Sequence, residues 1–251
     1  MIEISDDVLD HLVHAKKVAV LTGAGISAES GIATFRGKNG IWSKLKPEEL
    51  ASMDGFLQNP ARVLEWYEHR RTIVENVQPN AAHTTLAEMQ NYYEEFVIST
   101  QNIDGLHVRA GSTTVYELHG NIMRNRCNEC GRRIENIDLD APLKCQCGGL
   151  IRPDVVWFGE MLPIDVLDKS FAAAQHADVY FSIGTSAAVY PAAYLPIEAK
   201  NCGAFVIEIN LEPTELSALV DVSFRGKAGD ALPSLWHTVK TKIEQSRINN
   251  R

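Results

Sequence analysis

The stretch KVAVLTGAGISA, residues 17–28, decides the fold, because an apolar run leads directly into a glycine-rich turn. The run at 17–21 is apolar at nearly every position, which is typical of a parallel strand covered on both faces. The residues that follow match the G-x-G-x-x-A form of a dinucleotide turn, where glycines let the backbone approach a pyrophosphate and a helix N-terminus favours negative charge. This match is weak alone, because glycine turns also simply join strands to helices.

Further apolar runs and helical patterns alternate along the rest of the chain. Strands are predicted at 96–99, 115–118, 179–183 and 205–209. Helices are predicted at 60–76, 81–93, 192–201 and 230–243. This alternation predicts an α/β fold with a Rossmann-like, doubly wound parallel sheet.

Four of the five cysteines form two close pairs, Cys127 with Cys130 and Cys145 with Cys147. Glycines follow each pair and permit tight turns, so four thiolates can surround one zinc ion. Two disulfides are the alternative, but nothing in the sequence indicates an oxidising compartment. We therefore predict one structural zinc ion with a full shell of four sulfurs, which leaves no open position for catalysis.

The regions at 38–77 and 121–151 fit the sheet pattern poorly and are interpreted as two insertions. We predict one unit over 1–251 with two lobes. The large, Rossmann-like lobe takes 1–37, 78–120 and 152–251. The small lobe takes the helical insertion and the zinc module.

Composition and charge exclude several classes of protein. The chain has 251 residues, of which 45% are hydrophobic and 22% charged, as in a soluble globular protein. Its formal net charge of -8 argues against nucleic-acid binding. The N-terminus MIEISDDVLDHLVHAKK lacks a secretory signal and no run is long enough to cross a bilayer, so we expect a cytoplasmic protein without a membrane partner. The oligomeric state stays open, and a monomer is compatible with the sequence.

An ordinary dehydrogenase site lacks one part here, the acidic residue about twenty positions after the glycine turn. That stretch contains KPEEL at 46–50, which is polar and helical. Asn210, Leu211 and Glu212 close a later strand and offer groups able to bond a ribose. Gly184-Thr185-Ser186 follows another strand and can donate hydrogen bonds at the same sheet edge.

Taken in order, these motifs resemble those of sirtuins, the NAD-dependent protein-lysine deacylases. The resemblance runs from about Lys17 to about Leu232. One departure is the second cysteine pair, spaced C-x-C where the family often has C-x-x-C. The matching motifs are Gly23-Ala24-Gly25-Ile26-Ser27, Thr34-Phe35-Arg36, Thr100-Gln101-Asn102-Ile103-Asp104, His119-Gly120, the cysteine pairs, Val156-Trp157-Phe158-Gly159-Glu160, Gly184-Thr185-Ser186 and Ile209-Asn210.

The resemblance implies a reaction that consumes NAD. The acyl-lysine carbonyl oxygen attacks the ribose carbon that carries nicotinamide, nicotinamide leaves, and an imidate forms. A base then takes a proton from the ribose hydroxyls, so that one attacks the imidate carbon and water releases free lysine and O-acyl-ADP-ribose. By resemblance the base is His119, whose residue type titrates near neutral pH.

The resemblance also assigns the remaining parts of the NAD site. Gln101 and Asn102 would hold ribose hydroxyls and a water, with Asn102 counted as catalytic, and Asp104 would accept from the nicotinamide carboxamide. Without the resemblance this run reads as a polar strand-to-helix turn. Phe35 would shield the reactive ribose from water, with Arg36 near the phosphates. The other implied cofactor-binding residues are Gly23, Ala24, Gly25, Ser27, Ala28, Thr34, Ile103, Gly184, Thr185, Ser186, Asn210, Leu211, Glu212 and Ala228.

Acyl selectivity is predicted from Tyr67 and Arg70, which lie three apart on one helix face. In one sirtuin class a Tyr-x-x-Arg at this place reads the distal carboxylate of succinyl- and malonyl-lysine, and a guanidinium fork suits a carboxylate. Ala51 resembles the small-residue wall that gives such chains room. The alternative is that Arg70 belongs to a solvated, charged helix face.

The substrate peptide is predicted to add as a strand along Val156, Trp157, Phe158 and Gly159, although an ordinary core strand is the alternative. We expect removal of acetyl, succinyl and malonyl groups from protein lysines. The alternative activity is mono-ADP-ribosyl transfer from the same NAD site. An inactive NAD- or zinc-binding adaptor ranks lower, because it would require loss of the base or the amide pair, and His119, Asn102 and Asp104 are all present. A nicotinamide-linked oxidoreductase ranks third, and an absorbance change from reduced cofactor would distinguish it.

Overall fold

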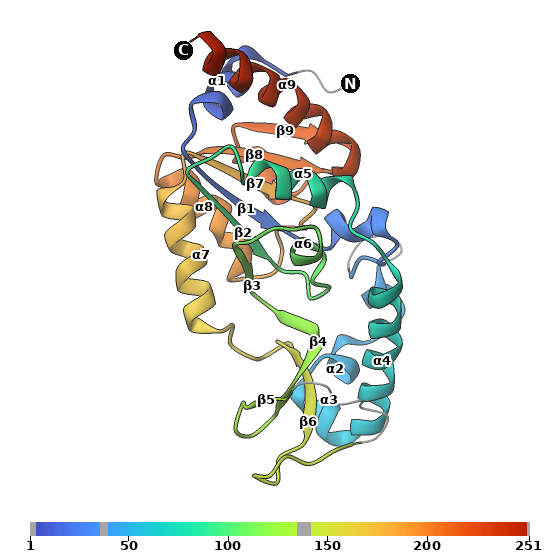
Figure 1. Ribbon diagram of the computed structural model, residues 1–251. Helices are drawn as coiled ribbons and strands as arrows, with labels where there is room; N and C mark the ends of the chain where they lie inside the picture. The colour runs from blue at the N-terminus through green and yellow to red at the C-terminus, as the bar shows by residue number, and fades with distance from the viewer. Residues whose placement is uncertain (1–3, 36–39, 135–141, 250–251) are drawn as a thin grey trace.

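The computed structural model describes residues 4–35, 40–134 and 142–249. A six-stranded parallel sheet forms its larger part (Figure 1). The strand order is β3-β2-β1-β7-β8-β9. The strands are β1 (Lys17–Thr22), β2 (Glu95–Thr100), β3 (Val115–Glu117), β7 (Val179–Ile183), β8 (Phe205–Asn210) and β9 (Val222–Arg225).

The order of the strands reverses direction beside β1. The chain runs outward from β1 to β2 and β3, then returns to place β7 on the other side of β1, where Val20 is paired with Ile98 and with Phe181. Such a reversal leaves a crevice at the carboxyl ends of the two central strands. The predicted α/β, doubly wound fold is confirmed, and its switch point lies between β1 and β7.

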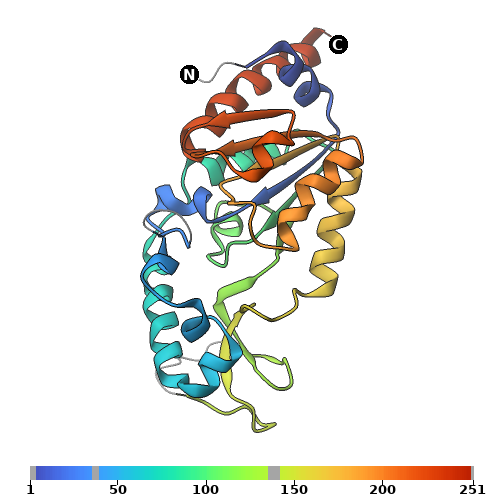
Figure 2. The ribbon, with the colours of Figure 1, turned by 180° about the vertical axis from the view of Figure 1, so that it is seen from behind.

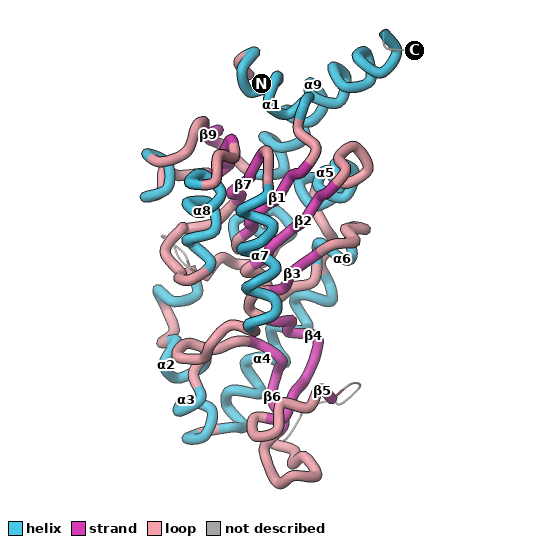
Figure 3. Tube along the Cα trace, turned by 90° about the vertical axis from the view of Figure 1, so that its left-hand side faces the viewer, coloured by secondary structure: helices cyan, strands magenta, loops and turns pink. Residues whose placement is uncertain are grey.

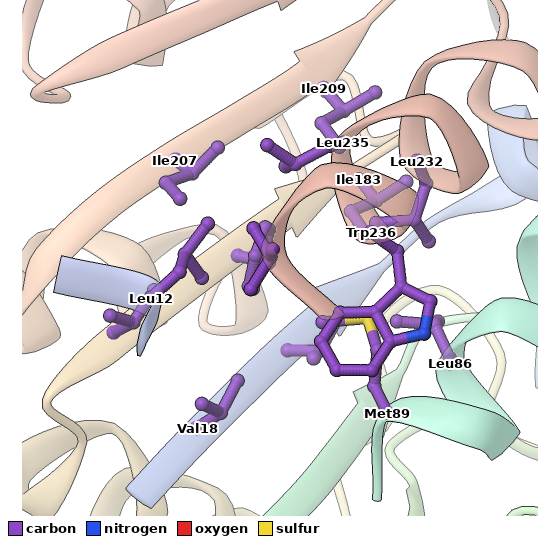
Figure 4. Close-up of a cluster of buried hydrophobic side chains, with 14 of the residues drawn as sticks. Leu12, Val18, Leu86, Met89, Ile183, Ile207, Ile209, Leu232, Leu235 and Trp236 are labelled. Atoms are coloured by element: carbon purple, nitrogen blue, oxygen red, sulfur yellow. The ribbon is translucent and has the colours of Figure 1, made fainter. Parts of the chain in front are cut away.

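One face of the large sheet is covered by three helices, which are α1 (Asp6–His14), α5 (Ala81–Met89) and α9 (Ala228–Asn249). Alternate strand residues such as Val18 and Ile207 point into this layer, where they pack with Leu86 and Trp236 (Figure 4). This is the largest group of buried apolar side chains in the described chain. It anchors the sheet from which the site is built.

The opposite face is covered by α7 (Ile164–His176) and α8 (Leu195–Asn201), as Figure 2 and Figure 3 show. Here the other set of strand residues, including Leu21 and Tyr180, packs against Ala174 and Leu195. Burial on both faces explains why the central strands read as continuous apolar runs. Both termini lie at the end of the molecule far from the smaller lobe (Figure 1).

The smaller lobe combines short helices with a second sheet (Figure 1). Its helices are α2 (Pro47–Leu50), α3 (Met53–Gln58) and α4 (Pro60–Asn76), and its antiparallel strands, in the order β5-β4-β6, are β4 (Gly120–Cys127), β5 (Arg133–Ile134) and β6 (Ile151–Val155). The predicted division of the chain assigns 152–155 to the large lobe. In the structure these residues belong to β6, which pairs with β4 in the sheet of the small lobe. Phe56, Tyr67 and Trp157 lie in the apolar cluster of this lobe.

Local sequence accounts for the helix boundaries. Asn59 accepts the backbone N–H of Arg62 and precedes Pro60, so α4 begins where it was predicted. The predicted helix at 81–93 is shorter, because α5 ends at Met89 and the chain then turns into β2. The helix expected at the dinucleotide turn is a 3₁₀ helix, η1 (Ala24–Ser30), which begins within the turn itself.

The remaining elements are short. They are α6 (Leu106–Arg109), η2 (Ile41–Ser43), η3 (Ala192–Tyr194) and η4 (Glu215–Ala218). The sequence analysis missed α1, α6, α7, β9 and the antiparallel sheet. Among the described residues, no helix combines the length and the apolar character that a membrane span requires.

Candidate functional site

A cavity of about 1120 Å³ lies at the carboxyl ends of β1 and β7, at the switch point of the sheet. It extends from the loop after β8 to the aromatic side chains of the small lobe. Most residues predicted to bind the dinucleotide line it, namely Gly23, Ala24, Gly25, Ala28, Thr34, Phe35, Gln101, Asn102, Ile103, Gly184, Thr185, Ser186, Asn210, Leu211, Glu212 and Ala228. Arg36 lies outside the described residues.

Two glycine turns form one wall of the cavity by direct backbone contact. The N–H of Gly25 donates to the carbonyl oxygen of Gly184 at 2.8 Å. A Cβ on Gly184 would lie 2.4 Å from the backbone nitrogen of Ile26, and the φ of Gly184 is +61°. Only glycine permits this approach. The turns after β1 and β7 are therefore locked together and leave backbone groups facing the cavity.

Behind this wall, three of the predicted residues form a buried hydrogen-bonded chain. The Asn102 amide donates to Ser27 Oγ at 3.1 Å, and Ser27 donates to Asp104 Oδ2 at 2.8 Å. The backbone N–H of Leu106 donates to the other carboxylate oxygen. Burial raises the pKa of Asp104. Ser27 and Asp104 thus support Asn102 from behind and do not line the cavity.

His119, the residue directly before β4, lines the same cavity. Its Nδ1 lies 2.9 Å from the carbonyl oxygen of Gln101. A carbonyl can only accept, so Nδ1 carries the proton and Nε2 keeps a lone pair. Burial lowers the pKa of His119, against the opposing effect of the Gln101 carbonyl. The ring is therefore a neutral base near pH 7, as general-base catalysis requires.

The far end of the cavity is walled by aromatic side chains. Tyr67 lines it and is 2% exposed, together with Phe35, Trp42, Trp66 and the small Ala51. The rings of Trp42 and Trp66 stack with centroids 5.9 Å apart. Such a wall excludes water and accepts an aliphatic chain.

Arg70 lies next to this wall but does not line the cavity. Its guanidinium carbon is 4.8 Å from the ring centroid of Phe35 and 5.1 Å from that of Trp66. The side chain is buried, and its Nε has no hydrogen-bond partner in the described part of the chain. Burial lowers the pKa of Arg70. The alternative of a solvated helix face is wrong, because this cation is removed from water.

The predicted peptide segment continues from β6 along the cavity. The N–H groups of Val156 and Phe158 donate to the carbonyls of His119 and Ala51, both at 2.9 Å. The Phe158 side chain is 45% exposed, whereas Trp157 is buried in the small lobe at 2%. Val156, Trp157, Phe158 and Gly159 all line the cavity in part. The segment turns at Gly159, whose φ is +86°, and the N–H groups of Val156, Trp157 and Phe158 already have partners within the chain.

Glu208 is a supporting residue that the sequence analysis missed. Its carboxylate is buried in β8 and accepts from Ser217 Oγ at 2.6 Å and from Ser223 Oγ at 2.9 Å. Arg225 donates to it at 2.8 Å. Thr214 Oγ1 also donates to Glu208, which holds the loop at 213–215 that lines the cavity beyond Glu212. A charged residue inside an apolar strand, FVIEIN, is the sequence signal for such a role.

The other cavity residues, to which the sequence analysis gave no role in the site, lie in η1, at or after the ends of β6, β7, β8 and β9, or in the aromatic wall. Their signal is position, because loops after parallel strands converge on one edge. They are Glu29, Trp42, Trp66, Val155, Glu160, Leu162, Ala188, Val189, Tyr190, Pro191, Ile209, Pro213, Thr214, Glu215, Gly226 and Lys227.

The four predicted metal ligands converge beside the small sheet. The sulfurs of Cys127, Cys130, Cys145 and Cys147 all lie within 4.8 Å of one another. Two of the separations are 3.4 and 3.9 Å, close to the spacing of about 3.8 Å that a tetrahedron with Zn–S bonds of about 2.3 Å requires. A hydrogen bond from Arg132 lowers the pKa of Cys145 to about 6, which favours the thiolate that binds metal. Against a backbone hydrogen bond from Gly149, the neighbouring thiols raise the pKa of Cys147 to about 11, so the support for metal binding comes from the geometry of the four sulfurs. The cluster fits one structural zinc ion.

Comparison with known proteins agrees with this geometry. The Sir2 family model matches residues 23–191. An NAD-dependent protein deacylase of Aquifex aeolicus (strain VF5) is 49% identical over 231 residues, covering 90% of this chain and 96% of the relative.

Two solved structures show related complexes. A Sir2 homologue bound to NAD superimposes with a TM-score of 0.90 at 44% identity, covering 96% of both chains. A Sir2 mutant with a deacetylated p53 peptide and 3'-O-acetyl ADP ribose has a TM-score of 0.83 at 33% identity, covering 92% of this chain and 97% of that one. The chain belongs to the Sir2 family.

Proposed function

We propose that this protein is an NAD-dependent protein-lysine deacylase that removes acetyl groups and also the acidic succinyl and malonyl groups. The deacylase activity is supported by the family, by relatives named for that activity, and by a neutral His119 in the cavity beside the glycine turns. NAD is the co-substrate, and the zinc ion has a structural role.

The residues that line the cavity have separate roles in this proposal. The glycine turns and the loop after β8 bind the nucleotide. Gln101 and Asn102 orient the ribose next to nicotinamide, and Phe35 keeps water from it. The lone pair on His119 Nε2 then takes the proton from a ribose hydroxyl, while Nδ1–H stays on the Gln101 carbonyl.

Arg70 carries the proposal of acidic acyl groups. The Arg70 guanidinium has no salt bridge in the described chain, its Nε has no hydrogen-bond partner there, and Asp104 attracts it only from a distance. Burial of such a cation is costly, and an anion delivered by a ligand offsets that cost. Tyr67 faces the cavity one helical turn away on the same helix, and Ala51 leaves room beside it. A succinyl or malonyl carboxylate would join the two side chains, after Arg70 moves from behind the aromatic rings.

Arg70→Met tests this proposal against Arg62→Met, an exposed arginine on the same helix. We expect Arg70→Met to lower the ratio of kcat/KM for succinyl-lysine over acetyl-lysine peptides about 10- to 100-fold, the value of a charged hydrogen bond. Mass spectrometry of both peptides, with and without NAD, gives the rates. An equal loss for the two acyl groups would contradict the assignment of Arg70.

The same assay separates the alternative activity. Deacylation leaves the adenylate in free O-acyl-ADP-ribose, whereas mono-ADP-ribosyl transfer leaves an adenylate label on protein. We also propose a cytoplasmic location, since a zinc-thiolate cluster suits a reducing compartment. Fractionation of cells that produce the protein would test it.

A further inference from the structure

The indole of Trp157 is held in one position by its surroundings. It is 2% exposed and packs against Phe56, with ring centroids 5.2 Å apart. The guanidinium carbon of Arg152 lies 4.0 Å from its ring centroid on another side. A side chain confined in this way can direct its one polar group with little loss of conformational freedom.

That polar group is used on the acyl end of the cavity. Trp157 Nε1 lies 2.8 Å from the hydroxyl oxygen of Tyr67. An indole N–H can only donate, so the Tyr67 oxygen is the acceptor. Among the described residues no acceptor is found for the proton of Tyr67 itself. Because Tyr67 lines the cavity, this proton is left for a ligand.

A buried cation strengthens the arrangement. Arg152 is 2% exposed, donates to the carbonyl of Val155 at 2.9 Å, and pairs with Glu160. Glu160 also accepts the backbone N–H of Trp157 at 2.8 Å, so the pair fixes both the ring and the main chain. The cation polarises the indole, and consecutive hydrogen bonds polarise one another, which makes Tyr67 a better donor.

We propose that Trp157 is a positioning residue for acyl selectivity, which turns the Tyr67 hydroxyl proton towards the carboxylate of an acidic acyl-lysine. The inference rests on the proposed recognition of succinyl and malonyl groups. It gives Trp157 a role different from peptide-strand pairing, because its side chain is buried in the small lobe. An acetyl group has no distal carboxylate and gains nothing from the oriented proton.

The substitution Trp157→Phe keeps an aromatic ring over Arg152 and removes the N–H. We expect it to lower the succinyl-to-acetyl ratio of kcat/KM about three- to tenfold, the effect of one hydrogen bond. In a Tyr67→Phe background the same substitution should lower the ratio no further, because the group that it orients is gone. Trp236→Phe is the matched control, since that indole donates to Glu88 at 3.0 Å in the other lobe.

An equal fall for both acyl groups, or a full effect of Trp157→Phe in the Tyr67→Phe background, would show that Trp157 only packs, and would overturn the inference. Failure of the underlying proposal shows earlier, as absent succinyl removal by the unaltered protein. If Trp157→Phe does not fold, indole N–H signals in ¹⁵N spectra replace it. Tyr67→Phe identifies the Trp157 signal, which must move with a succinyl-lysine peptide and not with an acetyl-lysine one.

Discussion

One end of the cavity is walled by backbone atoms and the other by side chains. At the end proposed to bind the nucleotide (the nucleotide end), the backbones of Gly25 and Gly184 touch, and their position follows from the pairing of β1 with β7. At the end proposed to bind the acyl group (the acyl end), the wall consists of side chains from α4 and from the segment after β6, such as Tyr67 and Trp157. A backbone wall cannot change without changing the fold, whereas a side-chain wall can. We therefore expect damage at the first end to affect all substrates and damage at the second to affect selectivity.

Loss of the metal should have the largest effect on activity, and it should disturb the acyl end more than the nucleotide end. Zinc binds zinc-finger peptides with about 10–16 kcal/mol, comparable to the whole stability of a domain. Cys145→Ser should therefore disorder the strands β4 and β6 and remove nearly all turnover, while ADP-ribose binding weakens less. Metal analysis measures the zinc content, calorimetry measures ADP-ribose binding, and peptide assays measure turnover.

Cys202→Ser provides the control, because that thiol is exposed and lies outside the cluster. Full turnover by metal-free Cys145→Ser would show that zinc does not support the acyl end.

His119→Ala should lower kcat about 10²- to 10⁴-fold for every acyl group, the usual contribution of a general base. His176→Ala is the control, since its Nδ1 also bonds a backbone carbonyl, that of Ala172, but on the exposed surface of α7. Because burial lowers the pKa of His119, the acid limb of the pH–rate profile should fall below pH 6.5. An acid limb with its midpoint above pH 6.5, or a loss of activity for only one acyl group, would show that His119 is not the general base.

Gly184→Ala should weaken NAD binding about 10- to 100-fold, equally for all acyl substrates. The added Cβ would meet the backbone of Ile26 at 2.4 Å, and the strained φ costs about 1–3 kcal/mol. Gly203→Ala is the control, because its φ is +96° but a Cβ there meets nothing within 4 Å. The KM for NAD measures the effect. A change in acyl selectivity from Gly184→Ala would contradict the division between the two ends.

Sequence patterns reveal the nucleotide end far better than the acyl end. Glycine spacing at 23–25 predicts a tight turn that a pyrophosphate can approach, although the contact between Gly25 and Gly184 is not part of that pattern. The spacing of Tyr67 and Arg70 predicts a shared helix face, but not that Arg70 packs behind Phe35. The donation from Trp157 to Tyr67 joins residues 90 positions apart, and no local pattern carries it.

The missed elements have physical reasons as well. In α7, IDVLDKSFAAAQH, the buried residues are Ser170 and Ala174, so small side chains and not large apolar ones mark its buried face. The edge strand β9 has only four residues, VSFR. In the small sheet, GNIMRNRC buries Asn125, whose amide oxygen accepts from Arg71, so polar residues occupy positions that a pattern search reserves for apolar ones. Partners distant in sequence make these residues compatible with burial.

Acid should weaken the nucleotide end through two buried histidines behind it. His83 and His107 have ring centroids 4.9 Å apart. His83 lies 3.5 Å from Ser27 Oγ, and His107 Nε2 lies 2.9 Å from Thr22 Oγ1. Burial lowers the pKa of His83 to about 4 and that of His107 to about 3. Both rings are therefore neutral in the folded protein near pH 7.

In the unfolded chain the histidine pKa values are near 6.5, so between pH 6.5 and about 4 these histidines are protonated in the unfolded chain and stay neutral in the folded protein. The free energy of unfolding should thus fall with pH in this window, by up to about 1.4 kcal/mol per pH unit for each histidine. Urea unfolding at pH 7, 6 and 5 measures the slope. His107→Gln should reduce it by about a third to a half, because His83 and His119 have pKa values lowered by burial as well, whereas His237→Gln, an exposed control, should not. An unchanged slope in His107→Gln would mean that acid weakens the protein elsewhere than behind the glycine turns.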